Sequence, residues 1–372
     1  MQDNRLNIGI AGAGGFARFA AHAFLAVPGI NITGITDIKL SAATAMADSL
    51  NSKVFKNYES LLKEESIELI YIATPPYLHY EQSKMALQAG KHVLCEKPAA
   101  LRSSEAEELM ALADAHQLLY TVNLMQRYNP LFAIVRNIVN QKLLGGFLHG
   151  YFENYASDES LNADHWFWDE AQSGGIFIEH SVHFFDLFEG WLGAGKVTHA
   201  LQLNRPGITK PIVDRVQVTV LYKDGVVNFY HGFDQPKILD RQEMRLQFEH
   251  GEITLYEWIP VRMKLHALLS KKQLEKIGDL LVNFSIEHHY ESLAESKKVR
   301  GRFSEITFDE HVTIEYGNAS QKEIRYKEML TAMITDQWSW ITDRKHVRVI
   351  DGTNGVQSLK IAEAASRAAQ NF

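Results

Sequence analysis

The chain has 372 residues, which is long for one domain and sufficient for two. Hydrophobic residues make up 46% of it and charged residues 22%, a balance that supports a sizeable core and excludes general disorder. Its 38 Lys and Arg against 45 Asp and Glu give a net charge of -7, which argues against nucleic acid or an anionic membrane as the main partner. The single cysteine, Cys95, excludes an intrachain disulfide and a cysteine-based zinc cage.

The N-terminal segment and the hydropathy of the chain predict a cytoplasmic location. Residues 1–5 lead straight into an apolar strand, without the hydrophobic segment of a secretory signal. No later run is long and apolar enough to span a bilayer. We therefore expect a cytoplasmic protein with no membrane partner.

The first 123 residues alternate short apolar strands with helices. This alternation predicts a doubly wound parallel sheet of the Rossmann type, in which ligands bind at the carboxyl edge of the strands. The expected strands cover residues 6–11, 30–36, 53–55, 69–73, 92–95 and 118–122.

A glycine-rich turn follows the first strand directly. It has the pattern G-x-G-x-x-A, a helix follows it, and the second strand ends on Asp37, roughly 25 residues further on. Strand, glycine turn, helix, strand and acid together form the dinucleotide-binding fingerprint in its required context. Glycine-rich turns also occur for packing alone, but the context favours a pyrophosphate site formed by Gly12, Gly14, Gly15, Phe16 and Ala17.

Near Asn123 the pattern changes to strands with two-residue alternation. Val216, Val218 and Val220 share one face, and similar alternation recurs near residues 244–248 and 312–316. We expect residues 1–123 to form the nucleotide-binding domain. Residues 124–372 are expected to form an α+β domain on a large, mostly antiparallel sheet. Apolar residues at helical spacing predict a helical insertion in it at about 261–284.

The stretch Glu96-Lys97-Pro98 ends the fifth expected strand, at the edge where ligands bind. A lysine beside a proline of fixed φ is well suited to reach over a crevice. We expect Lys97 to donate to the oxygen of a substrate that undergoes hydride transfer. Cys95, in the strand itself, is expected to be inert packing.

A second segment that contains candidate catalytic residues is the run from Gly174 to Asp186. If this run is helical from about Ile178, Glu179 and His183 stand one turn apart on one face. A carboxylate beside an imidazole is what a general base for an alcohol needs, although a buried structural pair has the same pattern. Glu179, His180 and His183 can also chelate an ion, but no further ligand spacing supports this, and no metal is predicted.

Two further groups of aromatic and histidine residues call for interpretation. The run from His165 to Trp168 contains two tryptophans, which stack on sugar rings but are more often buried in a core, and we favour the core. The tandem His288-His289 lies in a charged stretch, which predicts solvated side chains.

Together these segments resemble the glucose–fructose oxidoreductase/inositol dehydrogenase (Gfo/Idh/MocA) family of nicotinamide-dependent oxidoreductases. The likeness covers nearly the whole chain, and the Glu-Lys-Pro strand is its most specific part. The matching segments are Gly12 to Ala17, Ala73-Thr74-Pro75 with His79, Ala89 to Pro98, Arg127 to Pro130, Gly174 to Asp186, and Asp351-Gly352 with the last helix.

The resemblance implies a catalytic lysine at Lys97, before a cis peptide at Pro98, and a catalytic histidine at His183. It implies a cofactor site that adds to the glycine turn and Asp37 the residues Thr74, Pro75, His79, Glu96, Lys97 and Arg127. The expected substrate residues are Lys97, Arg127, Tyr155, Trp166, His180 and His183. The Asp37 carboxylate would repel a 2′-phosphate and thus favours NAD over NADP, while Lys39 softens that preference.

Two departures from the family pattern concern this site. The family usually carries Asp-x-Gly-x-His where this chain has Glu179-His180-Ser181-Val182-His183. The expected orienting carboxylate of Glu179 is therefore one methylene longer. Pro76 stands where asparagine is common, so one cofactor or substrate contact is expected to be missing.

These residues and the resemblance together predict an oxidoreductase that transfers a hydride between a nicotinamide cofactor and a sugar, inositol or related polyol. Two alternatives remain open at this point: an NAD-dependent glycoside hydrolase of the same fold, and a non-catalytic NAD or sugar sensor. A homodimer or homotetramer is expected, because an antiparallel sheet with one apolar face left over suits self-association.

Overall fold

The computed structural model describes residues 5–207, 211–289, 297–301 and 305–370. The chain forms two compact units, and each is discontinuous in sequence. The first unit contains residues 1–128, 164–186 and 326–363, and the second contains residues 129–163, 187–325 and 364–372. Within the part of the chain that the structure describes, no helix combines the length and the hydropathy that crossing a membrane requires.

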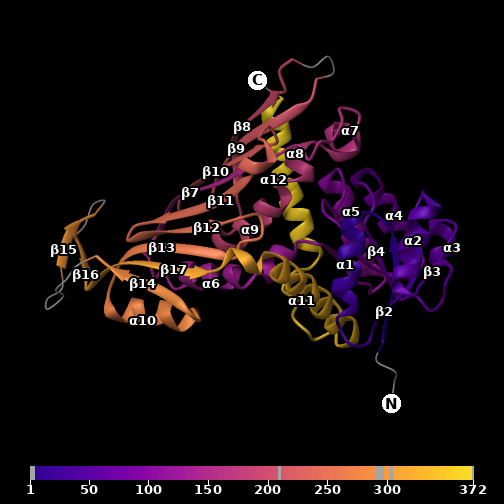
Figure 1. The fold of residues 1–372 in the computed structure, drawn as a ribbon, viewed down its shortest axis with the longest axis horizontal. Coiled ribbons are helices and arrows are strands. Elements are labelled where there is room, and N and C mark those ends of the chain that lie inside the picture. Colours follow the sequence, from indigo (N-terminus) through magenta and orange to yellow (C-terminus); the bar gives the residue numbers. More distant parts are fainter. Residues whose placement is uncertain (1–4, 208–210, 290–296, 302–304, 371–372) are drawn as a thin grey trace. The chain divides into compact units, whose positions relative to one another are not determined.

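The first unit is built on a six-stranded sheet in which every pair of neighbours is parallel (Figure 1). The strand order β3-β2-β1-β4-β5-β6 reverses between β1 and β4, which is the switch point where dinucleotides bind in this topology. The predicted doubly wound sheet is thereby confirmed. Its strands are β1 (Leu6–Ala11), β2 (Ile30–Thr36), β3 (Lys53–Val54), β4 (Leu69–Ile72), β5 (His92–Cys95) and β6 (Tyr120–Val122).

Helices connect these strands, and the central strands consist mainly of buried apolar residues. All four residues of β4 are buried, as expected for a parallel strand that is covered on both faces. The connecting elements are α1 (Gly15–Leu25), α2 (Leu40–Leu50), α3 (Tyr58–Leu62), η1 (Pro76–Leu78), α4 (His79–Gln88) and α5 (Ser103–Ala115).

Later parts of the chain complete the first unit. On helix α11 (Lys322–Thr342), the ring of Tyr326 packs 5.0 Å from that of Phe19 and 6.0 Å from that of Phe16 on α1. On α12 (Gly352–Ala369), Lys360 forms a 2.6 Å ion pair with Glu107 on α5. The other elements that begin in this unit are η2 (Met125–Tyr128), η3 (Trp166–Trp168), α7 (Glu170–Ser173), α8 (Ile176–Glu179) and α9 (Val182–Leu192). Residues 187–192 of α9 belong to the second unit.

The second unit is built on a nine-stranded sheet in the order β14-β17-β13-β12-β11-β7-β10-β9-β8. Among its described strands, β7 and β10 pair in parallel and the other neighbours pair antiparallel, which confirms the predicted mostly antiparallel sheet. The strands are β7 (Phe147–Tyr155), β8 (Lys196–Asn204), β9 (Val213–Leu221), β10 (Val226–Gly232), β11 (Arg241–Phe248), β12 (Gly251–Tyr256), β13 (Arg262–Leu269), β14 (Phe284–His288) and β17 (Glu310–Gly317).

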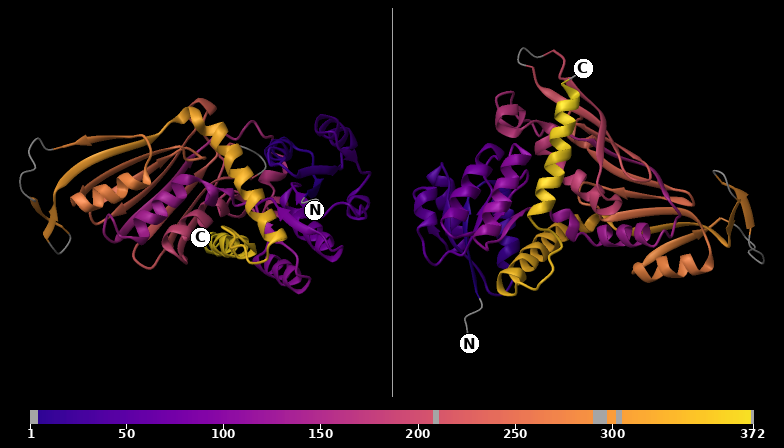
Figure 2. Two further views of the ribbon diagram at one scale, coloured as in Figure 1. Left: turned by 90° about the horizontal axis from the view of Figure 1, so that it is seen from below. Right: turned by 180° about the vertical axis from the view of Figure 1, so that it is seen from behind.

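Apolar and polar residues alternate along the strands of this sheet, and the apolar residues point to one face. Val216, Val218 and Val220 are almost fully buried, as their spacing predicts. Helices α6 (Pro130–Asn140) and α10 (Lys271–Leu280) lie on the same face of the sheet (Figure 2). A hydrogen bond from Lys276 Nζ on α10 to Gln141 Oε1 after α6 joins their neighbouring ends.

The structure differs from the sequence-based expectation over residues 261–284. Only the second part of this range is the helix α10, because Arg262–Leu269 forms strand β13. Apolar residues alternate strictly along β13 and point into the core, and this period of two outweighs the partial helical spacing of the same residues. A separate two-stranded ribbon, β15 (Lys297–Arg300) with β16 (Glu305–Phe308), follows β14 (Figure 2).

Candidate functional site

The glycine turn between β1 and α1 crosses the end of β4 closely. Gly12 has a φ of +99°, and a Cβ added there would lie 2.5 Å from the carbonyl oxygen of Ala73. Only glycine fits this position, because both the backbone conformation and the space exclude a side chain. At Gly14 and Gly15, by contrast, a Cβ would meet nothing within 4 Å. The backbone is therefore open at the N-terminus of α1, where an anion can approach amide groups.

Asp37 holds this turn from the end of β2. Its Oδ2 accepts a hydrogen bond of 2.8 Å from the backbone amide of Ala13, and its Oδ1 accepts one of 2.7 Å from the amide of Lys39. The carboxylate is partly exposed and is fixed at the carboxyl edge of the sheet. Phe16 packs on Phe19 and Tyr326, and Ala17 is buried beneath the turn.

The turn after β4 is held by His79, the first residue of α4. Nδ1 of His79 lies 2.7 Å from the carbonyl oxygen of Pro98, and Nε2 lies 2.7 Å from that of Thr74. The ring is 1% exposed, so both nitrogens are engaged within the protein. His79 therefore holds the turn that contains the predicted cofactor residues Thr74 and Pro75, and both of its ring nitrogens are engaged with main-chain oxygens.

Glu96 is buried at the end of β5 and is engaged with two neighbouring strands. Its Oε1 accepts hydrogen bonds from the Tyr71 hydroxyl at 2.5 Å and from Asn123 Nδ2 at 2.7 Å. Burial raises the pKa of this carboxyl, while the two donors act in the opposite direction. Sequence reasoning missed both partners. Their position was a usable signal, because Asn123 directly follows β6 as Glu96 follows β5.

The ammonium group of Lys97 is held by Glu179. Lys97 Nζ donates to Glu179 Oε1 at 2.6 Å and to the main-chain oxygen of Glu179 at 2.8 Å. The two side chains are 18% and 10% exposed, so the pair is largely shielded from solvent. The Lys97–Pro98 peptide bond is cis, as the resemblance implies.

The predicted continuous helix through Glu179 and His183 is absent. Helix α8 ends at Glu179, and α9 begins at Val182 after His180 and Ser181. The amides of residues 184 and 185 return to the carbonyl oxygen of Ser181, which starts a new helix there. The one-turn spacing predicted between Glu179 and His183 therefore does not apply, and the Glu179 carboxylate pairs with Lys97.

His183 is buried near the start of α9, with 4% of its surface exposed. Burial lowers the pKa of its imidazole well below the usual value, and the positive charge of Lys97 lowers it further. The ring is therefore neutral at pH 7, which is the form that can accept a proton.

Arg127 forms a buried ion pair with Asp186. Nε and Nη2 of Arg127 donate to the two carboxylate oxygens of Asp186, both at 2.8 Å, and Nη2 also donates to its main-chain oxygen at 2.7 Å. Asn354 on α12 adds a hydrogen bond to Asp186 Oδ1 at 3.2 Å. Arg127 was predicted as a cofactor and substrate residue, and in the structure its guanidinium is held by Asp186, the fifth residue of α9.

The remaining predicted substrate residues lie in different places. Trp166 is half-buried in η3, which precedes α7, and α7 packs on η1 next to the Thr74 turn. His180 is half-buried between α8 and α9, with its ring 5.7 Å from that of Phe184. Tyr155 belongs to the second unit, where its ring lies 5.2 Å from Tyr230 and beneath the Arg241 guanidinium.

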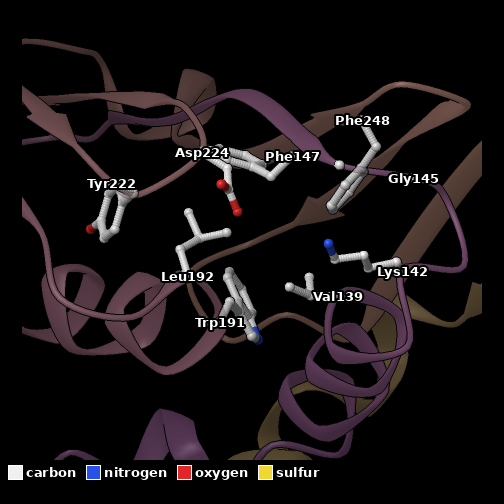
Figure 3. Close-up of a pocket in the computed structure, with 10 residues that line it drawn as sticks. Val139, Lys142, Gly145, Phe147, Trp191, Leu192, Tyr222, Asp224 and Phe248 are labelled. Carbon is white, nitrogen blue, oxygen red and sulfur yellow. The ribbon is translucent and has the colours of Figure 1, made fainter.

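A small pocket of about 80 Å³ lies within the second unit (Figure 3). Trp191, Leu192 and Phe248 are among the side chains that line it, and no predicted site residue is. Sites for drug-sized ligands typically hold roughly 300–1,000 Å³. This pocket is therefore too small for a sugar with its cofactor.

Two family models together match most of the chain. The Gfo/Idh/MocA oxidoreductase family model with an NAD-binding Rossmann fold matches residues 6–124, and the model of the C-terminal alpha/beta domain of the same family matches residues 151–371.

Curated relatives match shorter stretches. The uncharacterized oxidoreductase YrbE of Bacillus subtilis is 26% identical over 250 residues, which are 67% of this chain and 65% of the relative. Glucose-6-phosphate 3-dehydrogenase of the same organism is 28% identical over 184 residues, which are 48% of this chain and 52% of that enzyme. The matched part of this chain thus spans less than two thirds of the length of either relative.

Solved structures share the fold over nearly the full length. The WlbA dehydrogenase from Bordetella pertussis, in complex with NADH and UDP-GlcNAcA, has a TM-score of 0.80 and 17% identity, covering 100% of this chain and 97% of that one. Levoglucosan dehydrogenase in complex with NADH and L-sorbose has a TM-score of 0.77 and 17% identity, with 99% and 97% covered.

Proposed function

This chain belongs to the Gfo/Idh/MocA family of oxidoreductases, and we propose that it transfers a hydride between a nicotinamide cofactor and a sugar, inositol or related polyol. The observation that carries the proposal is the pairing of Lys97 with Glu179 in the unit that also holds the neutral, buried His183. An ammonium donor and a neutral imidazole are the two groups that alcohol oxidation needs beside a hydride acceptor.

The glycine turn fits a dinucleotide. The open backbone at Gly14 and Gly15 would receive the pyrophosphate, and Asp37 would accept hydrogen bonds from the adenosine ribose. The fully exposed Ile38 beside Asp37 offers an apolar surface for the adenine. Because Asp37 is negatively charged and fixed by two amides, it disfavours a 2′-phosphate, and we assign NAD as the preferred cofactor.

In the proposed oxidation, His183 removes the hydroxyl proton and Lys97 donates a hydrogen bond to the oxygen as negative charge develops there. The nicotinamide, when bound, supplies the hydride acceptor. Glu179 positions Lys97 by accepting hydrogen bonds from its ammonium with two oxygens, and Arg127 positions α9 through Asp186. In the reverse reduction the same two side chains return the proton and polarise the carbonyl.

The relatives and the side chains together support the proposed substrate class. Glucose-6-phosphate 3-dehydrogenase is named for a sugar, and the WlbA dehydrogenase was solved with a sugar nucleotide. In this chain Trp166, His180 and Tyr155 are the proposed substrate residues. Residues 1–123 are proposed as the cofactor domain and 124–372 as the substrate and oligomerisation domain, in a homodimer or homotetramer.

The test is a screen of polyols, aldoses and sugar acids with NAD and NADP, in which turnover is measured by the absorbance of the reduced nicotinamide. We expect turnover with at least one polyol or sugar and NAD, and Lys97→Met is expected to lower kcat by at least about 100-fold while NADH still binds. Normal turnover in Lys97→Met would refute the assigned role of Lys97. Release of nitrophenol from a nitrophenyl glycoside without net NADH formation would instead favour the glycoside hydrolase alternative.

A further inference from the structure

Three histidines from distant parts of the sequence meet on the second unit. His266 lies on β13, His311 lies on the neighbouring strand β17, and His289 directly follows β14 on the other side of β17 (Figure 1). In the register of β13 with β17, His266 stands opposite Thr313 and His311 stands opposite Leu268. The amide of His289 donates to the carbonyl oxygen of His311 at 2.9 Å, which fixes the third histidine beside β17.

The three side chains share the solvent-facing side of the sheet. Their strand neighbours Leu265, Ala267 and Val312 point into the core, so the alternation turns His266 and His311 outward. His266 and His289 are exposed and His311 is half-buried. An ion from solvent can therefore reach the cluster without any opening of the fold.

The ring nitrogens are close enough to share one ion. Nε2 of His266 lies 2.8 Å from Nε2 of His311, and one ligand atom from each of the three residues lies within 4.8 Å of the other two. Two imidazole nitrogens on one tetrahedral zinc ion stand about 3.3 Å apart, because Zn–N bonds measure roughly 2.0–2.1 Å. Because the three ligand atoms already lie within 4.8 Å of one another, small side-chain rotations bring all three nitrogens to one centre.

We propose that His266, His289 and His311 form a binding site for a first-row transition-metal ion, with Zn²⁺ as the best-suited occupant. Three neutral imidazoles are a ligand set that zinc, nickel and copper accept, whereas calcium and magnesium require oxygen ligands. The fourth position is open to water. The site ties the end of β14 to β17 and β13, and it is independent of the proposed hydride chemistry.

The surroundings favour a cation at this place. Glu287 on β14 brings its Oε1 to 3.9 Å from Nδ1 of His289, which adds a negative charge beside the cluster. The hydrogen bond between His289 Nε2 and Thr313 Oγ1, 2.8 Å long, orients the third ring over β17.

A matched control is present one residue before His289. His288 lies on the opposite side of β14, where its Nδ1 pairs with Glu310 Oε2 at 3.0 Å. It is the same residue type as the three cluster residues, but it points to the other face and is paired with Glu310. The variant His288→Ala therefore measures how much of any binding is due to scattered surface histidines.

The full chain is freed of any affinity tag and treated with a chelator, and the chelator is removed. It is then titrated with ZnCl₂ in a calorimeter. We expect one saturable ion per chain, a rise in Tm, and at least a tenfold loss of affinity in His266→Ala and His289→Ala but not in His288→Ala. Co²⁺ as a probe should give the intense visible absorption of a tetrahedral site. Absence of saturable binding, or an equal loss in His288→Ala, would overturn the proposal. Because His289 is exposed beyond the end of β14, its variant is expected to fold even if His266→Ala does not.

Discussion

The ammonium of Lys97 is bonded to both the carboxylate and the main-chain oxygen of Glu179, at 2.6 and 2.8 Å. The end of β5 is thereby joined to the last residue of α8, 82 positions later. Two acceptors on one residue fix the orientation of the ammonium group, so the direction of its third N–H bond is fixed as well. Glu179 is therefore a positioning residue for Lys97.

Shortening or neutralising Glu179 is expected to lower turnover. Glu179→Asp withdraws the oxygen by ~1.5 Å, about the length of one bond between carbons, and so opens the 2.6 Å contact. Glu179→Gln keeps the length and removes the charge. We expect kcat to fall at least about tenfold in both, because misplacing a donor weakens transition-state stabilisation, with little change in NADH affinity.

Steady-state kinetics and NADH fluorescence titration check this, with Glu170→Gln on exposed α7 as the control. If Glu179 acted only on the fold, the unfolding midpoint would drop together with kcat. A wild-type kcat in Glu179→Asp would refute the positioning role of Glu179.

Substitutions at two glycines of the turn should separate stability from cofactor binding. Gly12→Ala introduces a Cβ 2.5 Å from the oxygen of Ala73 at a φ of +99°, and we expect it to destabilise the fold by at least about 2 kcal/mol. Gly14→Ala meets no protein atom within 4 Å. It should therefore leave Tm unchanged and weaken NADH binding, because the added methyl occupies the space for the pyrophosphate. Unchanged NADH affinity in Gly14→Ala would place the pyrophosphate elsewhere.

The Arg127–Asp186 pair should behave as a coupled buried unit. Removing one partner leaves a buried charge without its counterion, so Arg127→Met and Asp186→Leu are each expected to lower the free energy of unfolding by about 3–5 kcal/mol. The double variant removes both charges and should lose less than the sum of the single losses. Urea denaturation of the four proteins completes the cycle. Simple additivity would contradict the coupling, and Glu108→Gln, which breaks an exposed ion pair with Lys84, serves as the control.

His92 should make the protein less stable in mild acid. Burial, assisted by Arg344, lowers the pKa of His92 to about 4, and its Nδ1 accepts a hydrogen bond from the amide of Leu119. In the unfolded chain histidine titrates near 6.5, so between pH 6.5 and 4 the unfolded state binds a proton that the folded state does not. Stability falls as the pH falls through this window, by about 2–3 kcal/mol for this group.

The variant His92→Asn retains an acceptor near the Leu119 amide and removes the titration. We expect it to show a shallower loss of stability between pH 6.5 and 4 in urea denaturation, whereas His22→Asn, at an exposed position of α1, should follow the wild type. Parallel acid profiles for His92→Asn and the wild type would assign the acid sensitivity to other groups, such as the buried His231, whose pKa burial lowers to about 3.

Local patterns predicted the turn after the first strand and the strand that ends before Lys97. They were wrong over residues 262–269, where the structure has strand β13 and not the predicted helix. The break at His180 and Ser181 was not predicted, because neither residue is a strong helix breaker and the competing contact, Lys97, is distant in sequence. The same limit applies to Asp186, the partner of Arg127, because only the folded chain brings the two together. For Glu96, the place of Asn123 directly after β6 was a usable signal.

The discontinuity of the first unit has a consequence for biosynthesis. On the ribosome, the first 128 residues emerge long before residues 326–363, which complete the same unit. Until then Phe16 and Phe19 lack their contacts with the ring of Tyr326. A premature stop within residues 187–325 would therefore yield a chain that contains the whole six-stranded sheet but lacks the helical segment 326–363 of the same unit.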